Sequence, residues 1–267
     1  MRRLSVIWFS LLLSLQSGSA FGGKPGLSTD PAKRQLSLLF SREALSHLNT
    51  AGSEFYLSSE EKLLVALCNL ARFDGRLFIQ EVLIPSAADT SRAEMKALLS
   101  RLRQTAGIPP LLPAYSLTKT ALLHARDMGM QGDSGHISSD GRNFQQRISA
   151  YFPEHAGFAE NYHLGSGDPV EIILGLMAGR QDSELYLNNL LSPDLHFIGI
   201  SIQAHRKACS NTVMDFARKP KMPPGGKAQT GNRKKTEAYF MDCPKGRDYD
   251  QRRKNSFSLL NLFSRRK

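Results

Sequence analysis

A histidine and a glutamate in two polar segments are the residues of this chain best placed to do chemistry together. His136 lies in the segment GHISSDG, and Glu160 follows it in the triplet AEN. If the two segments form loops that converge on one cleft, the imidazole and the carboxylate could bind a divalent metal, polarise a water molecule or brace the loops. These three uses remain open at the level of this motif.

Neighbouring polar residues add candidate partners for the glutamate. An acidic side chain is rarely buried unless it is paired. A buried Glu160 therefore requires a partner, for which His136 is the first candidate and Arg147 the second. His155 and His163 flank Glu160 in the sequence and could approach the same cleft.

Two further histidines have plainer expected roles. His124 lies on the apolar stripe of a predicted helix, so we expect it in the core. His196 opens a predicted strand, where we expect a packing or surface role.

Several kinds of active site lack their sequence signatures. The chain has no Gly-x-Ser-x-Gly elbow, His-Glu-x-x-His helix, P-loop or dinucleotide fingerprint, and no cysteine in a polar activating context. A tight structural zinc site uses four ligands, whereas His136 and Glu160 supply two. The residues therefore predict at most a weakly bound divalent metal, such as zinc.

The spacing of apolar residues predicts helices followed by a small antiparallel sheet. Ser58 and Glu61 are spaced as a capping box, which predicts a helix start. This order of elements predicts an α+β domain with layered architecture. The predicted helices span 58–73, 77–83, 91–105, 116–130, 144–151 and 170–179, and the predicted strands span 196–204 and 211–217.

The chain divides into four predicted regions. Residues 1–20 combine a basic start, a short apolar run and small residues, a pattern typical of a signal peptide. Residues 21–57 are expected to form a weakly structured leader, and 58–217 the domain. Residues 218–267 are basic and rich in Pro and Gly, so we expect a largely disordered tail. We therefore expect an exported protein, secreted or in the periplasm or cell envelope.

The positive charge is concentrated in the predicted tail. The chain has a net charge of +11, and the segment 218–267 accounts for all of it. A nucleic-acid-binding domain is therefore not expected. The apolar island 256–263 lies between basic residues and could bind an anionic membrane surface, or it could be solvated or docked on the domain.

Three cysteines are too few to build a disulfide scaffold, so a hydrophobic core must hold the fold. Cys68 lies in an apolar helical pattern and is expected to be buried. Cys209 and Cys243 could form a disulfide in an oxidising compartment, and the sequence leaves this bridge open.

The landmarks between residues 58 and 217, taken in order, resemble those of the CAP superfamily of cysteine-rich secretory, antigen 5 and pathogenesis-related proteins, and its bacterial SCP-like members. They are CNLARFDGRLFIQEVL, PPLLPAYSLTKTALLHARDMGMQG, GHISSDGRNFQQR, AEN, NNLLSPDLHFIGISI and NTVMDFA. The resemblance implies a three-layer α-β-α sandwich. It also implies a cleft lined by histidines and acidic residues that holds a divalent metal in some members.

The resemblance assigns His136 and Glu160 to the first-histidine and glutamate places of this cleft, with Asn161 and Arg147 beside them. Tyr186 stands where the second histidine is expected, and a neutral phenol is a poor metal ligand at pH 7. The cleft is therefore expected to be partly degenerate.

Two functions follow as alternatives. The first is a binding role toward a lipid, glycan, cell-envelope or protein ligand, without catalysis. The second is a metal-assisted hydrolase acting on peptide or envelope substrates, with His136 as base or metal ligand and Glu160 as its partner.

Overall fold

A computed structural model of the chain describes residues 47–86, 91–149, 157–178 and 182–218. The predicted signal peptide, most of the leader and nearly all of the basic tail lie outside these residues. Within them, no helix is both long and apolar enough to cross a membrane. The helices and strands are α3 (Ser59–Phe73), α4 (Gly75–Phe78), the π-helical turn η1 (Ile79–Leu83), α5 (Ala93–Arg103), β1 (Leu112–Pro113), α6 (Tyr115–Gln131), α7 (Phe144–Ser149), β2 (Phe158–Leu164), α8 (Pro169–Ala178), α9 (Ser183–Leu190), β3 (Phe197–His205) and β4 (Cys209–Ala217).

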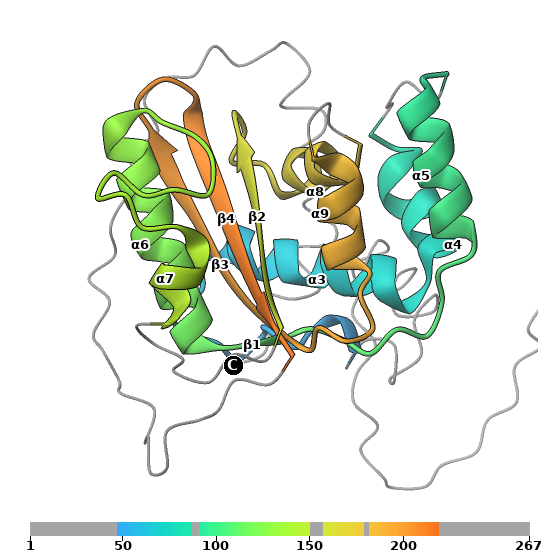
Figure 1. The fold of residues 1–267 in the computed structure, drawn as a ribbon. Helices are drawn as coiled ribbons and strands as arrows, with labels where there is room; N and C mark the ends of the chain where they lie inside the picture. Colours follow the sequence, from blue (N-terminus) through green and yellow to red (C-terminus); the bar gives the residue numbers. More distant parts are fainter. Residues whose placement is uncertain (1–46, 87–90, 150–156, 179–181, 219–267) are drawn as a thin grey trace, which may run out of the picture.

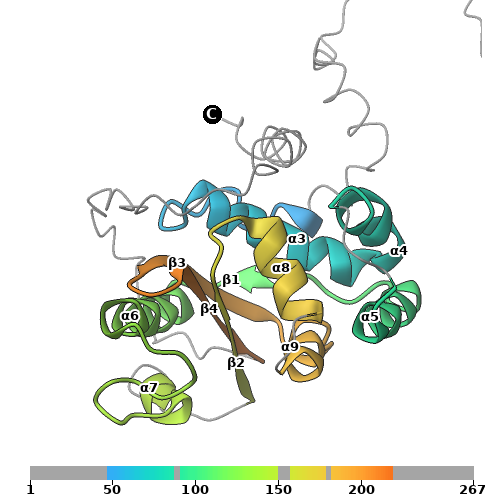
Figure 2. The same cartoon turned by 90° about the horizontal axis from the view of Figure 1, so that it is seen from above.

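The fold is α+β, as predicted, and helices cover both faces of a four-stranded sheet. The strand order is β1-β3-β4-β2. Helices α6 and α7 lie on one face, and α3, α8 and α9 lie on the other (Figures 1 and 2). Every residue of β4 from Ser210 to Ala217 is buried, because β4 is an inner strand with both faces covered.

The sheet is mixed rather than purely antiparallel. β2 and β3 pair with β4 in antiparallel register, but β1 pairs with β3 in parallel. β1 contains only two residues and follows a proline-rich connector, so its sequence carries no alternating pattern that would reveal a strand.

Helix α3 forms the centre of the larger helical layer. Its capping box is present: the Ser58 hydroxyl accepts from the N–H of Glu61, and a Glu61 carboxylate oxygen accepts from the N–H of Ser58. The helix is buried from Leu63 to Arg72, and it packs against α8 and β3. Cys68 is buried and free in this helix, as expected.

Arg72 is a fully buried cation that ties α3 to the chain after α9. Its guanidinium donates to the main-chain oxygens of Pro109 at 2.8 Å, Leu190 at 2.7 Å, Ser192 at 2.9 Å and Leu195 at 2.8 Å. Burial lowers the pKa of Arg72 to about 10. These bonds fix the end of α9, the helix that carries Tyr186.

The other helical layer is held close to the sheet by a glycine. A Cβ atom on Gly199 of β3 would lie 2.0 Å from the carbonyl carbon of Leu117 in α6. Only a residue without a side chain allows the helix backbone to approach the strand this closely. Helix α6 thereby places His124 and Thr120 over the sheet.

Three further expectations about the elements were wrong. The segment around Glu160 is the strand β2, not a loop. The segment that contains Tyr186 forms helix α9, which was not predicted. The expected leader 21–57 ends too late, because Leu48 and Tyr56 are buried in the main core.

Only one of the two cysteines of the predicted disulfide lies among the described residues. Cys209, at the start of β4, is disulfide-bonded. Cys243, the other cysteine of the predicted bridge, lies outside the described residues.

Candidate functional site

Glu160 lies in the middle of β2, at the edge of the sheet. Its register partner in β4 is Asp215, and opposite residues of an antiparallel pair lie on the same face. Both carboxyl side chains are buried beneath α6 and the loop that joins α6 to α7. The strand therefore brings two acids together in the interior.

His136 forms a hydrogen bond with Glu160 from that loop. The distance between His136 Nδ1 and Glu160 Oε1 is 2.7 Å. The His136 side chain is 37% exposed, whereas that of Glu160 is 1% exposed. The predicted pair therefore forms in the structure, with the carboxylate inside and the imidazole at the surface.

Arg147 of α7 is the second partner of Glu160. Its Nη2 donates to Oε1 at 2.8 Å and to Oε2 at 2.7 Å. Its Nη1 donates to the main-chain oxygen of His136 at 2.7 Å and to that of Arg142 at 3.2 Å. Arg147 thus joins the carboxylate to the loop that carries the histidine.

The ionisation of Glu160 is maintained by these partners. Burial alone would raise the pKa of Glu160. The hydrogen bond from His136 and the positive charge of Arg147 outweigh burial, so the pKa lies below its usual value. Glu160 is therefore a buried carboxylate at neutral pH.

Tyr186 of α9 reaches the outer nitrogen of His136. Its hydroxyl lies 3.2 Å from His136 Nε2, and burial raises the pKa of this phenol. In a neutral imidazole with its proton on Nδ1, Nε2 accepts a hydrogen bond from the tyrosine. The rings of His136, Tyr162 and Tyr186 stand edge to face, with centroids 5.1 to 6.1 Å apart.

His124 supports the loop from below. Its Nε2 lies 2.9 Å from the Gly135 oxygen, and its Nδ1 lies 3.2 Å from the Ser138 hydroxyl. Because a carbonyl only accepts, Nε2 carries the proton and Nδ1 accepts from Ser138. Burial lowers the pKa of His124, so it is a neutral, buried histidine.

Asp215 is the site residue that the sequence interpretation missed. Its Oδ2 accepts a short hydrogen bond from the Thr120 hydroxyl, and its Oδ1 has no hydrogen-bond partner among the described residues. Burial and the charge of Glu160 raise the pKa of Asp215 well above its usual value. An acid inside the apolar strand NTVMDFA was the available signal, because such a position predicts a paired or protonated carboxyl.

Other predicted site residues lie elsewhere. Asn161 does not line the cleft: it points to the opposite face of β2, where it donates to the Tyr186 main-chain oxygen at 3.0 Å. His163 lies on that same face, against Gly175 of α8. His196 pairs through its backbone N–H with Ala217, and His155 lies outside the described residues.

The residues present do not fit a divalent metal. Both oxygens of Glu160 accept from Arg147, and His136 uses Nδ1 on the same carboxylate. No group of three or more His, Cys, Asp or Glu side chains with metal-binding geometry occurs among the described residues. The predicted weak zinc site would therefore have to displace an existing ion pair.

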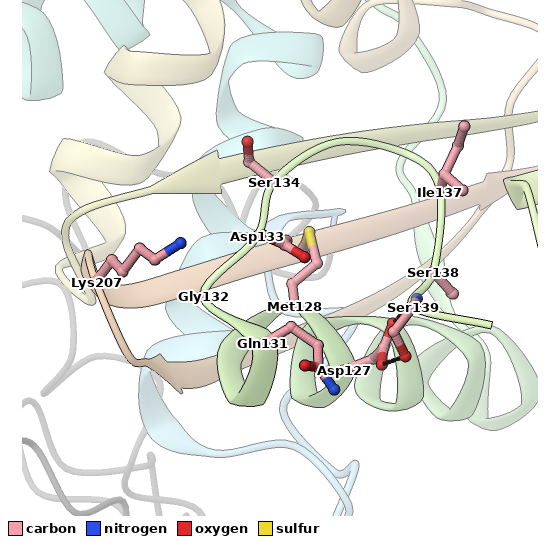
Figure 3. Close-up of a pocket in the computed structure, with 10 residues that line it drawn as sticks. All are labelled: Asp127, Met128, Gln131, Gly132, Asp133, Ser134, Ile137, Ser138, Ser139 and Lys207. Carbon is pink, nitrogen blue, oxygen red and sulfur yellow. Dashed lines mark hydrogen bonds between the residues drawn. The ribbon is translucent and has the colours of Figure 1, made fainter. Parts of the chain in front are cut away.

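A separate cavity lies on the other side of the loop 132–143, which carries His136 and is called the histidine loop below. It has a volume of about 500 Å³ and lies between the end of α6, the loop and the β3–β4 turn (Figure 3). Ser138 borders both this cavity and the His124 network, but His136 and Glu160 do not line it. The lining residues are Asp127, Met128, Gln131, Gly132, Asp133, Ser134, Ile137, Ser138, Ser139 and Lys207.

Comparison with known proteins identifies the class of domain. Residues 97–216 match the model of the cysteine-rich secretory protein family, CAP. Over these residues the match confirms the family resemblance that the order of the landmarks predicted. The match begins within α5, so it does not include α3 and α4, which the resemblance had included.

Two solved structures are similar to the chain. An outer surface protein from Borrelia burgdorferi is 21% identical, with a TM-score of 0.38, and the match covers 49% of this chain and 96% of that one. An extracellular protein containing an SCP domain from Bacillus anthracis strain Ames is 20% identical, with a TM-score of 0.37, and the match covers 47% of this chain and 40% of that one. No curated protein matches the chain.

Proposed function

We propose that this is an exported CAP-domain protein that binds a ligand at the cleft of His136 and performs no chemistry on it. The observation that carries this proposal is that other side chains of the protein already occupy the carboxylate of Glu160. Its carboxylate accepts from His136 and twice from Arg147, and it is 1% exposed. A carboxylate in this state is neither a free nucleophile nor an accessible base.

The accessible part of the cleft is formed by an imidazole edge and an aromatic ring. The exposed edge of His136 lies beside the half-buried ring of Tyr162. Such a surface suits a ligand with an apolar part and an uncharged hydrogen-bonding group.

This chemistry favours a lipid over a glycan or a protein as the ligand. The ring of Tyr162 provides an apolar contact for an acyl chain, and His136 Nε2 with the Tyr186 hydroxyl provides a polar anchor. Glycan or peptide binding is an alternative outcome of the same experiment.

Export is supported by the redox state of a cysteine. Cys209 is disulfide-bonded, and structural disulfides persist in oxidising compartments. This agrees with the signal-peptide pattern of residues 1–20 and with secretion or an envelope location.

The hydrolase alternative has less support. It needs His136, as a base or through a bound metal, to activate water. Arg147 and His136 already occupy the Glu160 carboxylate that a metal would share, and the Tyr186 hydroxyl lies 3.2 Å from Nε2, the nitrogen that would act as the base. The predicted membrane-binding role of the basic tail concerns residues outside those described, and it remains a prediction.

The experiment uses monomeric probes in place of membranes. Protein with 15N-labelled histidine is titrated with short-chain phosphatidylcholine below its micelle concentration, with chitin tetrasaccharide and with an apolar peptide. We expect the lipid to shift the His136 resonances and Tyr162→Ala to weaken binding. Leu123→Ala, on the exposed face of α6, is the matched control.

Each outcome decides the proposal. Because the lipid is zwitterionic, attraction to the basic tail contributes little to its binding. A preference for the saccharide or the peptide at His136 would keep the binding role and change the ligand class. Binding that is equal in wild type and Tyr162→Ala, or the absence of binding by all three probes, would refute the site.

A further inference from the structure

We propose that Arg147 is the resident cation of this cleft: its guanidinium takes the coordination sites on Glu160 that a divalent metal would need. The cleft is thereby a metal-independent site. This inference deepens the proposed function and depends on it only for the use of the cleft, because cation occupancy is measured separately from ligand binding.

Most lone pairs of the Glu160 carboxylate already accept hydrogen bonds. An ionised carboxylate offers about four lone-pair directions. His136 Nδ1 takes one on Oε1, and Arg147 Nη2 contacts Oε1 at 2.8 Å and Oε2 at 2.7 Å. A metal ion at either oxygen would compete with a charge-assisted hydrogen bond that is already formed.

Arg147 is held in place and cannot easily move away from Glu160. Its side chain is 7% exposed, and its other terminal nitrogen donates to the main-chain oxygens of His136 and Arg142 and to the Ser138 hydroxyl. Displacing the guanidinium from Glu160 would therefore also release the histidine loop. The arginine is fixed in the structure by contacts on both sides.

His136 has only one ring nitrogen that does not contact Glu160. Its Nδ1 is committed to Glu160, so only Nε2 remains to bind a metal. That nitrogen faces Tyr186, whose ring centroid is 6.1 Å from that of His136. A histidine at position 186 would add a second imidazole on this side, but it would not free the carboxylate.

Two explanations for a loss of metal binding at this cleft make different predictions. If the missing second histidine were the whole cause, Tyr186→His would restore a zinc site. If Arg147 is the resident cation, Tyr186→His alone will not, and the arginine must also be removed.

The test is isothermal titration of zinc into the full chain. Wild type, Tyr186→His, Arg147→Gln/Tyr186→His and Arg147→Lys/Tyr186→His are compared, each with and without His136→Ala. We expect stoichiometric, His136-dependent zinc binding only in the Arg147→Gln double variant. The lysine variant is the matched control because it retains the positive charge at position 147.

His136-dependent zinc binding by wild type or by Tyr186→His would overturn the proposal. A folded Arg147→Gln double variant that binds no zinc would also overturn it. If that variant folds only when zinc is added, the metal has replaced the arginine as the cation of the site, which supports the proposal. If it remains unfolded with zinc, the proposal fails.

Discussion

Replacing Arg72 tests whether a single buried cation holds the two halves of the larger helical layer together. Its guanidinium donates to four main-chain oxygens, those of Pro109, Leu190, Ser192 and Leu195. Arg72 is fully buried, and no acidic side chain pairs with it among the described residues. Arg72→Met keeps much of the side-chain volume and removes all four bonds.

The expected cost follows from the carbonyl groups left behind. A buried polar group without a partner costs about 1–3 kcal/mol, so the two buried carbonyls, those of Leu190 and Leu195, set a gross cost of about 2–6 kcal/mol. Removing the guanidinium also removes its own desolvation penalty, which is several kcal/mol for a buried ion. We therefore expect Arg72→Met to lower the free energy of unfolding by about 2–3 kcal/mol.

The measurement is urea unfolding followed by circular dichroism at pH 7. Arg101→Met, an exposed arginine on α5, is the control and should change stability by less than about 0.5 kcal/mol. Arg72→Lys should lie between wild type and Arg72→Met, because one ammonium cannot reach four separated carbonyls. A loss below about 1 kcal/mol in Arg72→Met would refute the assignment, since that is the value of one ordinary hydrogen bond.

Three further predictions concern the cleft. Glu160→Gln should destabilise the fold by about 3–5 kcal/mol at pH 7 by leaving Arg147 unpaired. Because the folded pKa of Glu160 is lowered, the stability that its carboxylate contributes is present above its unfolded pKa and is lost as pH falls through the folded pKa. Unfolding measured at pH 7 and in acid should therefore show the stability difference between wild type and Glu160→Gln shrinking in acid. Asp215→Asn should be more stable than wild type at neutral pH. The folded pKa of Asp215 is raised, so the stability that it contributes is present below its unfolded pKa and is lost as pH rises. A stability difference between Asp215→Asn and wild type that does not widen as pH rises would contradict a protonated Asp215. Tyr186→Phe should cost about 1 kcal/mol and shift the His136 Nε2 resonance in long-range 15N spectra, since it removes only the hydroxyl; an unchanged resonance would contradict the 3.2 Å contact.

The helices of the domain could be predicted from sequence because their apolar spacing coincides with burial. In α6, the predicted stripe from Leu117 to Met128 is buried, and the helix ends at Gly132 in a left-handed conformation. Helix α9 was missed because it is only eight residues long and contains two consecutive asparagines. Its position is fixed by Arg72, and that long-range contact has no local signal.

Strand β2 was missed for a physical reason that also explains the site. Its sequence FAENYHL places Glu160 and Asn161 at buried positions, where a strand pattern predicts apolar residues. Both are buried because partners distant in sequence satisfy them, Arg147 for the acid and Tyr186 for the amide. The polar residues that concealed the strand are therefore the ones that position the cleft.

The contact between His136 and Glu160 was predictable because burial of an acid demands a partner. Sequence reasoning treated Arg147 as an alternative to His136, whereas the structure uses both. Asp215 was not considered, since its neighbours in β4 are apolar and its relation to Glu160 depends on a register that only the folded sheet defines.

The charge balance of the buried layer limits what the cleft can recognise. Glu160 is ionised and is neutralised by Arg147, while burial lowers the pKa of His124 and raises that of Asp215, which favours the neutral form of each. The charged groups beneath the cleft therefore cancel, and little net electrostatic attraction reaches a ligand at the exposed edge of His136. Under the proposed binding role, we expect recognition at this edge to depend on hydrogen bonds to His136 and Tyr186 and on contact with the ring of Tyr162. Selectivity should accordingly respond to changes in ring and aliphatic side chains more than to salt concentration.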